Sequence, residues 1–357
     1  MATHNIVVFG GDHCGPEVSE NALVIVAAVV AEAVKVLKAL ESHSPSAGKF
    51  NLQDHLLGGC SIDATGSPLT DEALTAAKNA DAVLLGAIGG PKWGTGAVRP
   101  EQGLLRLRKE MGTYGNLRPC SFASDALVDY SPPQGRRLPR HRLHHCHGHG
   151  ALLARRGRAR DPPRRPPRPR PRPPAPVWSL DKANVMATSR LWRKTVTDVM
   201  AKEFPQLTVN HQLIDSAALL MVKNPRSLNG IVVTSNLFGD IISDEASAIP
   251  GSIGLSPSAS LSGIPDGKSR CNGIYEPIHG SAPDISGQGI VNPIGTILSV
   301  AMMCRYSLGL PQEASAIEQA VKNVVDGGIR TKDLGGSAGT KETGDAIVTE
   351  LVKLLKD

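Results

Sequence analysis

Residues 236–245 read Asn-Leu-Phe-Gly-Asp-Ile-Ile-Ser-Asp-Glu and place two carboxylates, Asp240 and Asp244, four residues apart at the predicted start of a helix. Four residues make about one helical turn, so the two side chains share a face. Like charges at this spacing repel each other, and a divalent cation such as Mg²⁺ would remove the repulsion because it prefers oxygen ligands. A solvated helix face is the alternative explanation. Apolar neighbours favour the cation site: Leu237, Phe238, Ile241 and Ile242.

A third carboxylate, Asp215, ends a β-like run within residues 212–217, Gln-Leu-Ile-Asp-Ser-Ala. Three carboxylates leave positions in the coordination shell of Mg²⁺ for water and substrate. The sequence therefore predicts an open, catalytic metal site rather than a closed structural one.

The chain of 357 residues is long enough for two domains with ordinary globular composition. Its longest apolar run, 22–31, is too short to cross a bilayer. The six cysteines contain no Cys-x-x-Cys pair, which argues against a zinc site or a disulfide framework. Because the strand-like run 6–9 follows the amino terminus without a basic leader, we expect a cytoplasmic protein that does not insert into membranes.

The net charge of +6 is concentrated in one segment. Residues 131–177 hold thirteen of the 39 basic residues and a single acid, Asp161, so the rest of the chain has 26 basic and 32 acidic residues. The body of the protein is therefore mildly acidic, and the basic character belongs to an insert-like stretch.

Strand-like and helical patterns alternate through the first ninety residues. The run Ile6–Phe9 leads into the glycine turn 10–17 and a helix to about Leu40, and a helix predicted from Asp71 is followed by a strand at 82–85. Such alternation predicts an α/β fold with a largely parallel sheet. The glycine turn is not the Gly-x-Gly-x-x-Gly fingerprint of a Rossmann fold, so it is either a structural turn or a binding loop.

Three basic residues are candidates for chemistry. Arg108 and Arg118 suit a clamp for carboxylates, because guanidinium binds a carboxylate bidentately. Lys182 follows a buried strand-like run and is a candidate general base, since burial or a metal ion lowers the pKa of a lysine. Surface ion pairs for the arginines and a surface position for the lysine are the alternatives.

A polar loop punctuated by glycine and proline covers residues 275–292, here called the cofactor loop. It precedes an apolar helix predicted at 294–306. Its backbone groups, His279 and Asp284 suit recognition of an adenosine moiety. A purely structural loop is the alternative.

Five ordered motifs carry a family resemblance: residues 10–17, 101–119, 179–185, 234–251 and 275–292. Together they resemble the isocitrate/isopropylmalate dehydrogenase family of β-decarboxylating dehydrogenases, in what looks like a fungal form. The similarity covers residues 1–130 and 178–357.

The resemblance implies an α/β fold of two domains. A cofactor-side domain would contain residues 1–113 and 252–357, and a middle domain with the dimer interface would contain 114–251. The implied substrate-binding residues are Glu101, Leu104, Leu105, Arg108, Arg118 and Asp215. The implied cofactor-binding residues are Gly89, Gly90, Glu276, His279, Gly280, Ser281, Ala282, Asp284 and Asn292. The implied metal ligands are Asp215, Asp240 and Asp244, holding Mg²⁺ or Mn²⁺.

The implied activity is the NAD-dependent oxidative decarboxylation of 3-isopropylmalate to 4-methyl-2-oxopentanoate in leucine biosynthesis. Lys182 would take the proton of the C2 hydroxyl, and Lys182 and Asp215 would reach the site from the partner subunit of a homodimer. Leu104 and Leu105 suit an isopropyl group, and Asp284 suits NAD because a carboxylate repels a 2′-phosphate. A related decarboxylating dehydrogenase of the isocitrate or tartrate type is the alternative.

Two stretches depart from the family. Residues 19–29 look like an addition of about eleven residues within the first helix, or nearly three turns. Residues 132–176 contain thirteen Arg, twelve Pro and five His, a composition that predicts a disordered segment without strands. The family normally has here a substrate-binding arginine, a tyrosine acid and a dimerisation arm, so the replacement resembles a shifted reading frame and implies impaired activity.

The arginine-rich segment also defines a hypothesis of a different class: an inactive scaffold that binds polyanions through phosphate contacts. Within 132–176 no aromatic residue is present to stack on bases. We therefore expect no nucleic-acid partner.

Overall fold

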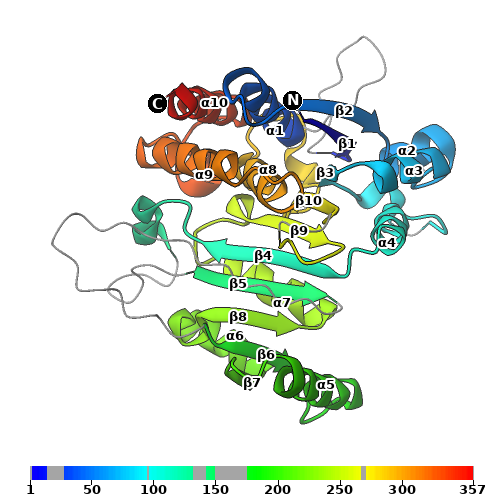
Figure 1. The fold of residues 1–357 in the computed structure, drawn as a ribbon, viewed down its shortest axis with the longest axis vertical. Helices are drawn as coiled ribbons and strands as arrows, with labels where there is room; N and C mark the ends of the chain where they lie inside the picture. Colours follow the sequence, from blue (N-terminus) through cyan, green and yellow to red (C-terminus); the bar gives the residue numbers. More distant parts are fainter. Residues whose placement is uncertain are drawn as a thin grey trace.

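The computed structural model describes residues 2–13, 28–94, 96–131, 142–148, 175–266 and 271–356. It is an α/β structure built on one ten-stranded sheet in the order β2-β1-β3-β10-β9-β4-β5-β8-β6-β7 (Figure 1). The strands are β1 Thr3–Gly11, β2 Lys49–His55, β3 Ala82–Ala87, β4 Gly115–Ser121, β5 Arg142–Gly148, β6 Val177–Asp181, β7 Val209–Leu213, β8 Gly230–Thr234, β9 Pro257–Leu261 and β10 Gly273–Pro277.

Helices connect and cover the strands. The α-helices are α1 Ala28–His43, α2 Gly59–Thr65, α3 Asp71–Asn79, α4 Pro100–Glu110, α5 Ala187–Glu203, α6 Ile214–Lys223, α7 Asn236–Ser247, α8 Ile294–Tyr306, α9 Pro311–Asp326 and α10 Thr340–Lys356. The short 3₁₀ helices are η1 Pro91–Trp93, η2 Asp125–Tyr130, η3 Pro225–Leu228, η4 Ile253–Leu255, η5 Pro283–Ile285 and η6 Lys332–Leu334.

Local sequence signals predicted several elements closely. The helices expected from Asp71 and over 294–306 are α3 and α8, and Thr70 caps α3 by accepting a hydrogen bond from the Ala73 amide. The strand expected at 6–9 is the middle of β1. The first predicted helix is described only from Ala28 onward, so most of the addition at 19–29 lies outside the described residues.

The sheet is parallel toward its edges and antiparallel in the middle. Strands β2, β1, β3 and β10 run in one direction, and β5, β8, β6 and β7 are parallel to one another. Strand β9 is antiparallel to both β10 and β4, and β4 is antiparallel to β5. Six of the nine pairings between the described strands are parallel, so the expectation of a largely parallel sheet is confirmed. The three antiparallel pairings at the centre were not foreseen, because period and length predict a strand but do not specify its partner.

The strand order keeps the two ends of the chain together. Strands β2, β1, β3, β10 and β9 come from residues 3–87 and 257–277, whereas the other five come from residues 115–234. One core contains Ile6 and Val8 of β1 together with Ile294 of α8 and Ile347 of α10. This arrangement suits the expected pair of domains, although their boundaries stay a prediction.

Both faces of the sheet are covered by helices (Figure 1). Alternate residues of β1 point into different cores, Ile6 into one with α1 and α8, and Val7 into one with α3 and α4. In β6, Leu180 packs toward α6 and α7, and Val177 packs toward α5. A sheet with two covered faces explains why these strands are apolar at successive positions.

The expectation that 132–176 contains no strand is wrong for seven residues. Residues Arg142–Gly148 form β5, whose backbone pairs with β4 on one side and β8 on the other. Strands β4 and β8 both have backbone groups that need hydrogen-bond partners inside the sheet. The need for a strand between β4 and β8 arises from the tertiary structure, so the arginine- and histidine-rich composition of this segment does not predict β5. The remainder of the predicted disordered segment, 132–141 and 149–174, lies outside the described residues.

Within the described ranges, no helix combines the length and the apolar content required to cross a membrane.

The central strand β9 provides a test of how the two halves of the sheet depend on each other. Leu261 is 2% exposed and pairs with Gly273 of β10 and Gly115 of β4. We expect Leu261→Ala to lower the free energy of unfolding by about 2–5 kcal/mol, because it leaves a cavity in a packed core, with a single unfolding transition. Chemical denaturation checks this, and Ile264→Ala, at a side chain 50% exposed, should change the free energy by less than about 0.5 kcal/mol. Two separated transitions in the Leu261 variant would contradict the expectation.

Candidate active site

The register across β9 aligns side chains from distant parts of the chain. Leu117 of β4 and Tyr275 of β10 both pair with Ala259, from opposite sides of β9. Strands β4 and β10 run in the same direction, so the next residues along them, Arg118 and Glu276, lie at one level of the sheet. The two segments are 158 residues apart in sequence, yet this register brings them to one place.

Arg118 is the centre of a polar cluster between β4 and α7. Its Nη1 atom donates to Oδ1 of Asp240 at 3.0 Å and to the Ser243 hydroxyl at 2.7 Å, and it lies 3.9 Å from Oδ1 of Asp244. Its Nε atom donates to Oδ1 of Asn116 at 2.9 Å. The Arg118 side chain is 11% exposed and those of Asp240 and Asp244 are 61% and 51% exposed. The guanidinium is therefore fixed, and the two carboxylates remain accessible.

Asp240 and Asp244 lie on one face of α7, as the sequence predicted. Burial raises the pKa of Asp244, the negative charge of Asp240 adds to the rise, and Arg118 opposes it. Two accessible carboxylates that repel each other are a donor set that Mg²⁺ or Mn²⁺ fits, because hard cations bind oxygen and neutralise the repulsion. The stretch that predicted the metal site thus has the geometry for two of its ligands.

Arg108 extends from the last turn of α4 to β10. Its Nη2 atom donates to Oε1 of Glu276 at 2.5 Å, with side chains 29% and 12% exposed. The Nε atom of Arg108 is buried and has no hydrogen-bond partner among the described residues. Glu276, predicted to bind the cofactor, thus contacts a predicted substrate-binding arginine.

Lys182 and Asp215 form a second cluster at the carboxyl ends of β6 and β7. Nζ of Lys182 donates to Oδ1 of Asp215 at 2.6 Å, and this hydrogen bond lowers the pKa of Asp215. Asp215 lies in the first turn of α6 rather than at the end of the β-like run. Behind them Asp181, 1% exposed, accepts two hydrogen bonds of 2.8 Å from Arg193 and one of 2.9 Å from the Ala183 amide, which fixes the turn that carries Lys182.

The three predicted metal ligands do not meet within one chain. Among the described residues no group of three His, Cys, Asp or Glu side chains is placed to hold a metal ion. Asp240 and Asp244 belong to α7, whereas Asp215 on α6 contacts Lys182. The single chain therefore assembles two separate clusters.

The glycines that follow β3 meet the cofactor loop. The carbonyl oxygen of Gly89 accepts a hydrogen bond of 2.8 Å from the hydroxyl of Ser281, which is 7% exposed. A Cβ atom on Gly89, where φ is +96°, would lie 2.9 Å from Oε1 of Glu101, and one on Gly90 would lie 2.2 Å from Nε2 of His13. Gly89 thus lies next to both Ser281 of the predicted cofactor set and Glu101 of the predicted substrate set.

His279 and its neighbours form the exposed turn of the cofactor loop. Nδ1 of His279 donates to the Gly280 carbonyl oxygen at 3.0 Å, and Nε2 is buried without a partner among the described residues. Burial lowers the pKa of His279, so the ring is harder to protonate than a free imidazole. A Cβ atom on Gly280 would meet no atom within 4 Å, and Ala282 has φ of +40°. The exposed Gly280 backbone therefore has room beside it for a ligand such as a nucleotide.

The remaining predicted residues have mixed surroundings. Asp284 is exposed in η5. Asn292 is 4% exposed and holds the start of α8, since Oδ1 accepts from the Ile294 amide and Nδ2 donates to Asp333. Leu104 packs partly against the core beside β3, whereas Leu105 is 63% exposed. Leu105 is therefore free to contact a ligand, and a cofactor contact of Asn292 stays a prediction.

The structure adds positioning residues that the sequence reasoning missed. Asn116 holds Arg118 and in turn donates to the hydroxyls of Ser258 and Ser260 on β9 at 2.8 and 2.9 Å. Ser243 lies one turn after Asp240, and Asp181 immediately precedes Lys182. Their closeness in sequence to these candidate residues could have identified them. Asn116 had no such signal, because its role depends on the pairing of β4 with β9.

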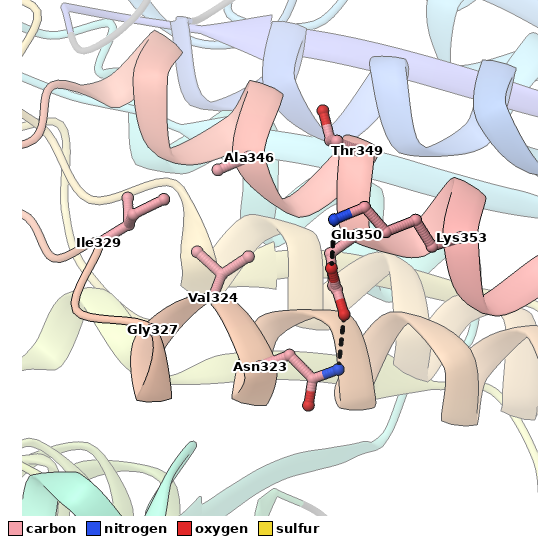
Figure 2. Close-up of a pocket in the computed structure, with 8 residues that line it drawn as sticks. All are labelled: Asn323, Val324, Gly327, Ile329, Ala346, Thr349, Glu350 and Lys353. Atoms are coloured by element: carbon pink, nitrogen blue, oxygen red, sulfur yellow. Dashed lines mark hydrogen bonds and ion pairs between the residues drawn. The ribbon is translucent and has the colours of Figure 1, made fainter.

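A hollow of about 300 Å³ lies elsewhere, between α9 and α10 (Figure 2). Glu350 at its edge accepts hydrogen bonds from Asn323 at 2.7 Å and Lys353 at 3.2 Å, and Val324, Ile329 and Ala346 line its apolar part. None of the predicted site residues lines this hollow, so it is separate from the candidate active site.

Known proteins share both the sequence and the fold. The family model described as isocitrate/isopropylmalate dehydrogenase matches residues 5–139 and 168–347. Proteins named 3-isopropylmalate dehydrogenase from Neurospora crassa and 3-isopropylmalate dehydrogenase A from Aspergillus niger are 65% and 62% identical over 386 and 383 positions, covering 100% of both chains in each case. Solved structures of an isocitrate dehydrogenase from Methylococcus capsulatus (25% identity, TM-score 0.75, 98% of this chain and 99% of that one) and of a beta-decarboxylating dehydrogenase from Thermococcus kodakarensis (30%, 0.71, 99% and 97%) are also similar.

The fold and the clusters of cations with carboxylates define a decarboxylating dehydrogenase of the two-domain α/β type, without a Rossmann fingerprint. The chain belongs to the isocitrate/isopropylmalate dehydrogenase family. The resemblance, the fold class and the enzyme class predicted from the motifs are confirmed, and the comparisons favour the dehydrogenase over the inactive polyanion-binding scaffold. The family match omits residues 140–167, within the arginine-rich segment that was predicted to be aberrant.

The lowered pKa of the half-buried His279 predicts a pH dependence. Its folded-state pKa is lowered from 6.5 by burial, so the unfolded state binds the proton more readily, and the native state loses stability as pH falls below about 6.5. We expect His279→Gln to remove this loss. As pH falls, the free energy of unfolding of the wild type should then decrease relative to that of the variant by at most about 1.4 kcal/mol per pH unit. Urea unfolding from pH 8 to pH 5 measures it. Parallel stability curves for the two proteins would contradict the prediction.

Proposed function

We propose that the chain oxidises and decarboxylates 3-isopropylmalate with NAD as the oxidant and Mg²⁺ or Mn²⁺ as the metal, as a step of leucine biosynthesis. The observation that carries the proposal is the cluster of Arg118 with Asp240 and Asp244. In this cluster Arg118 would bind a substrate carboxylate, and Asp240 and Asp244 would offer two oxygen ligands to a metal ion. The names of the curated relatives support the choice of substrate.

Each cluster would have a distinct part in the reaction. Arg118 and Arg108 would bind the two carboxylates of the malate moiety, because a guanidinium group pairs with a carboxylate. The Nζ atom of Lys182 would take the proton from the C2 hydroxyl as a general base. When bound, NAD accepts the hydride and the metal ion supplies Lewis acidity during loss of carbon dioxide.

The apolar end of the substrate would contact α4. Leu105 is 63% exposed and lies one turn before Arg108 on the same helix, so an isopropyl group next to a bound carboxylate would meet a leucine side chain. Isocitrate has a third carboxylate in place of this group. Burying that charge against leucine without a partner is costly, which favours isopropylmalate over isocitrate.

A homodimer would complete the metal site. On α6, Asp215 shares a face with Leu219 and Val222, and all three are more than 60% exposed. On the neighbouring α7, Leu237 and Ile241 are 64% and 58% exposed. The two helices pack together through their other faces, so their exposed apolar side chains are available to a second copy of the chain.

A twofold contact through α6 and α7 is consistent with shared active sites. Such an interface is self-complementary, so the same faces meet from both copies. It would bring Asp215 and Lys182 of one subunit toward Asp240 and Asp244 of the other, which supplies the third carboxylate that one chain lacks. We also propose the division into a cofactor-side domain, 1–113 and 252–357, and a middle domain, 114–251, that dimerises.

We propose a cytoplasmic location, supported by the cysteines. The four that the structure describes, Cys60, Cys120, Cys271 and Cys304, are free thiols, as is usual in a reducing compartment.

The arginine-rich segment predicts impaired turnover. Loss of a general acid typically lowers a rate by about 10²–10⁴-fold, and loss of a substrate-orienting arginine adds to it. We expect the chain to bind NAD and Mn²⁺ by calorimetry but to form NADH from isopropylmalate about 10²–10⁴-fold more slowly than a chimera in which residues 131–177 are exchanged for the corresponding segment of the Neurospora crassa relative.

The chimera also tests the function itself. It should oxidise isopropylmalate in preference to isocitrate and tartrate, and Asp240→Ala in the chimera should abolish both Mn²⁺ binding and turnover. A chimera that folds and dimerises but does not oxidise isopropylmalate would show that the proposed function is wrong. Ordinary turnover by the unaltered chain would contradict only the predicted impairment.

Charged residues in the proposed interface should dissociate the dimer. The double variant Leu219→Glu, Val222→Glu would place four carboxylates in the apolar contact without touching Arg118 or α7. We expect the sedimentation mass to fall from that of two chains to one, because unpaired buried charges are costly. Ile264→Glu, at an exposed position next to β9, should leave the mass unchanged. A double variant that remains dimeric would contradict the interface.

A further inference from the structure

Asp12 is a buried carboxylate that joins three segments of the cofactor-side sheet. It follows β1, is 2% exposed, and its Oδ2 atom accepts hydrogen bonds of 2.8 Å from both the Gly59 and the Gly89 amides. Its Oδ1 atom accepts one of 2.7 Å from the Cys60 amide. Burying a carboxylate is costly unless its oxygens are hydrogen-bonded, and here both are. One side chain therefore ties β1 to the start of α2 and to the glycine loop after β3.

Glycines create the space for this carboxylate. Gly58 has φ of +94°, and a Cβ atom there would lie 2.6 Å from Oδ2 of Asp12. Gly11 has φ of +86°, and a Cβ atom there would lie 2.2 Å from the Ala87 carbonyl oxygen, which accepts a hydrogen bond of 2.7 Å from the Asp12 amide. Both contacts are too close for a side chain, so the backbone is shaped around Asp12.

The segment that Asp12 holds is the one that meets the cofactor loop. Gly89 continues the connection. Its amide donates to Asp12, and its carbonyl oxygen accepts a hydrogen bond from the Ser281 hydroxyl. A second bond, of 2.8 Å, joins the Ser286 hydroxyl to the His13 carbonyl oxygen, one residue after Asp12. The segment from Ser281 to Ser286, which contains Asp284, is thereby attached at both ends to the corner organised by Asp12.

We propose that Asp12 is a positioning residue for NAD: it fixes the Gly89 peptide and, through Ser281, the loop that receives the nucleotide. The proposal rests on the proposed use of NAD. A role limited to stability would predict that Asp12 variants melt earlier but bind NAD and Mn²⁺ equally well once folded. A positioning role predicts that NAD affinity falls while Mn²⁺ affinity, set by Asp240 and Asp244, does not.

Asp12→Asn tests this with the smallest change of shape. The amide keeps one acceptor oxygen and directs N–H groups at backbone N–H donors, so at least one of the three bonds is lost. We expect the Kd for NAD, measured by calorimetry on the folded dimer, to rise at least about tenfold, as for loss of one charged hydrogen bond. The Kd for Mn²⁺ should stay within about twofold, and hydrogen exchange at the Gly89 amide should accelerate at least about tenfold.

Asp81→Asn is the matched control. Asp81 accepts a hydrogen bond of 2.8 Å from the Asn5 amide near the start of β1, at the end of the strand opposite to Asp12. This variant should leave the Kd for NAD within about twofold of the wild type. An equal loss of NAD affinity in both variants would show a general effect of stability and would overturn the proposal.

Ser286→Ala provides a second test if Asp12→Asn does not fold. It removes only the bond from the loop to His13 and should raise the Kd for NAD about threefold or more without changing the Kd for Mn²⁺. Unchanged NAD affinity in the folded Asp12 variant, or in the Ser286 variant if that is the one that folds, would overturn the positioning role alone. A wild-type chain that binds no NAD would overturn the proposed cofactor, and the positioning role with it.

Discussion

The antiparallel pairing of β9 with both of its neighbours is the constraint on which the candidate active site depends. It joins five strands from the two chain ends to five strands from the middle in one sheet. Because β4 and β10 share β9 as a partner, Arg118 and Glu276 leave the sheet at the same level. Helix α4 ends just before β4, and its Arg108 reaches Glu276. Residues from α4, β4 and β10 thus come together, although β10 is far from the other two in the sequence.

The charged groups of the site are already paired in the single chain. Arg118 contacts Asp240, Arg108 contacts Glu276, and Lys182 contacts Asp215. Such pairs hold long side chains in a limited set of positions, so less conformational entropy is lost when a ligand binds. Ligand carboxylates and a metal ion would share or replace these partners. The buried Arg118 and the exposed Asp240 and Asp244 suit this exchange, because the cation is fixed while the carboxylates stay accessible.

Sequence reasoning proposed most of the candidate site residues because short motifs combine local geometry with chemistry. The i, i+4 spacing of Asp240 and Asp244 specified their common face on α7, and the run before Lys182 specified a strand end. Sequence reasoning did not identify residues whose role depends on a neighbour across the sheet. Asn116 and Asp12 are examples, since each acts through strands or loops far away in sequence. Strand β5 is another, because β4 and β8 supply the pairing that its composition does not predict.

The sequence by itself determined the class of fold, the helix that carries Asp240 and Asp244, the family and the candidate residues, because periodicity and motif spacing are local properties of the chain. Only the tertiary structure decided the order and direction of the strands, the strand within the arginine-rich segment and the partners of each charged group. It also separated Asp215 from Asp240 and Asp244 within one chain. The physical reason is that hydrogen bonds between strands and contacts between helices satisfy groups distant in sequence, and many pairings are compatible with one local pattern.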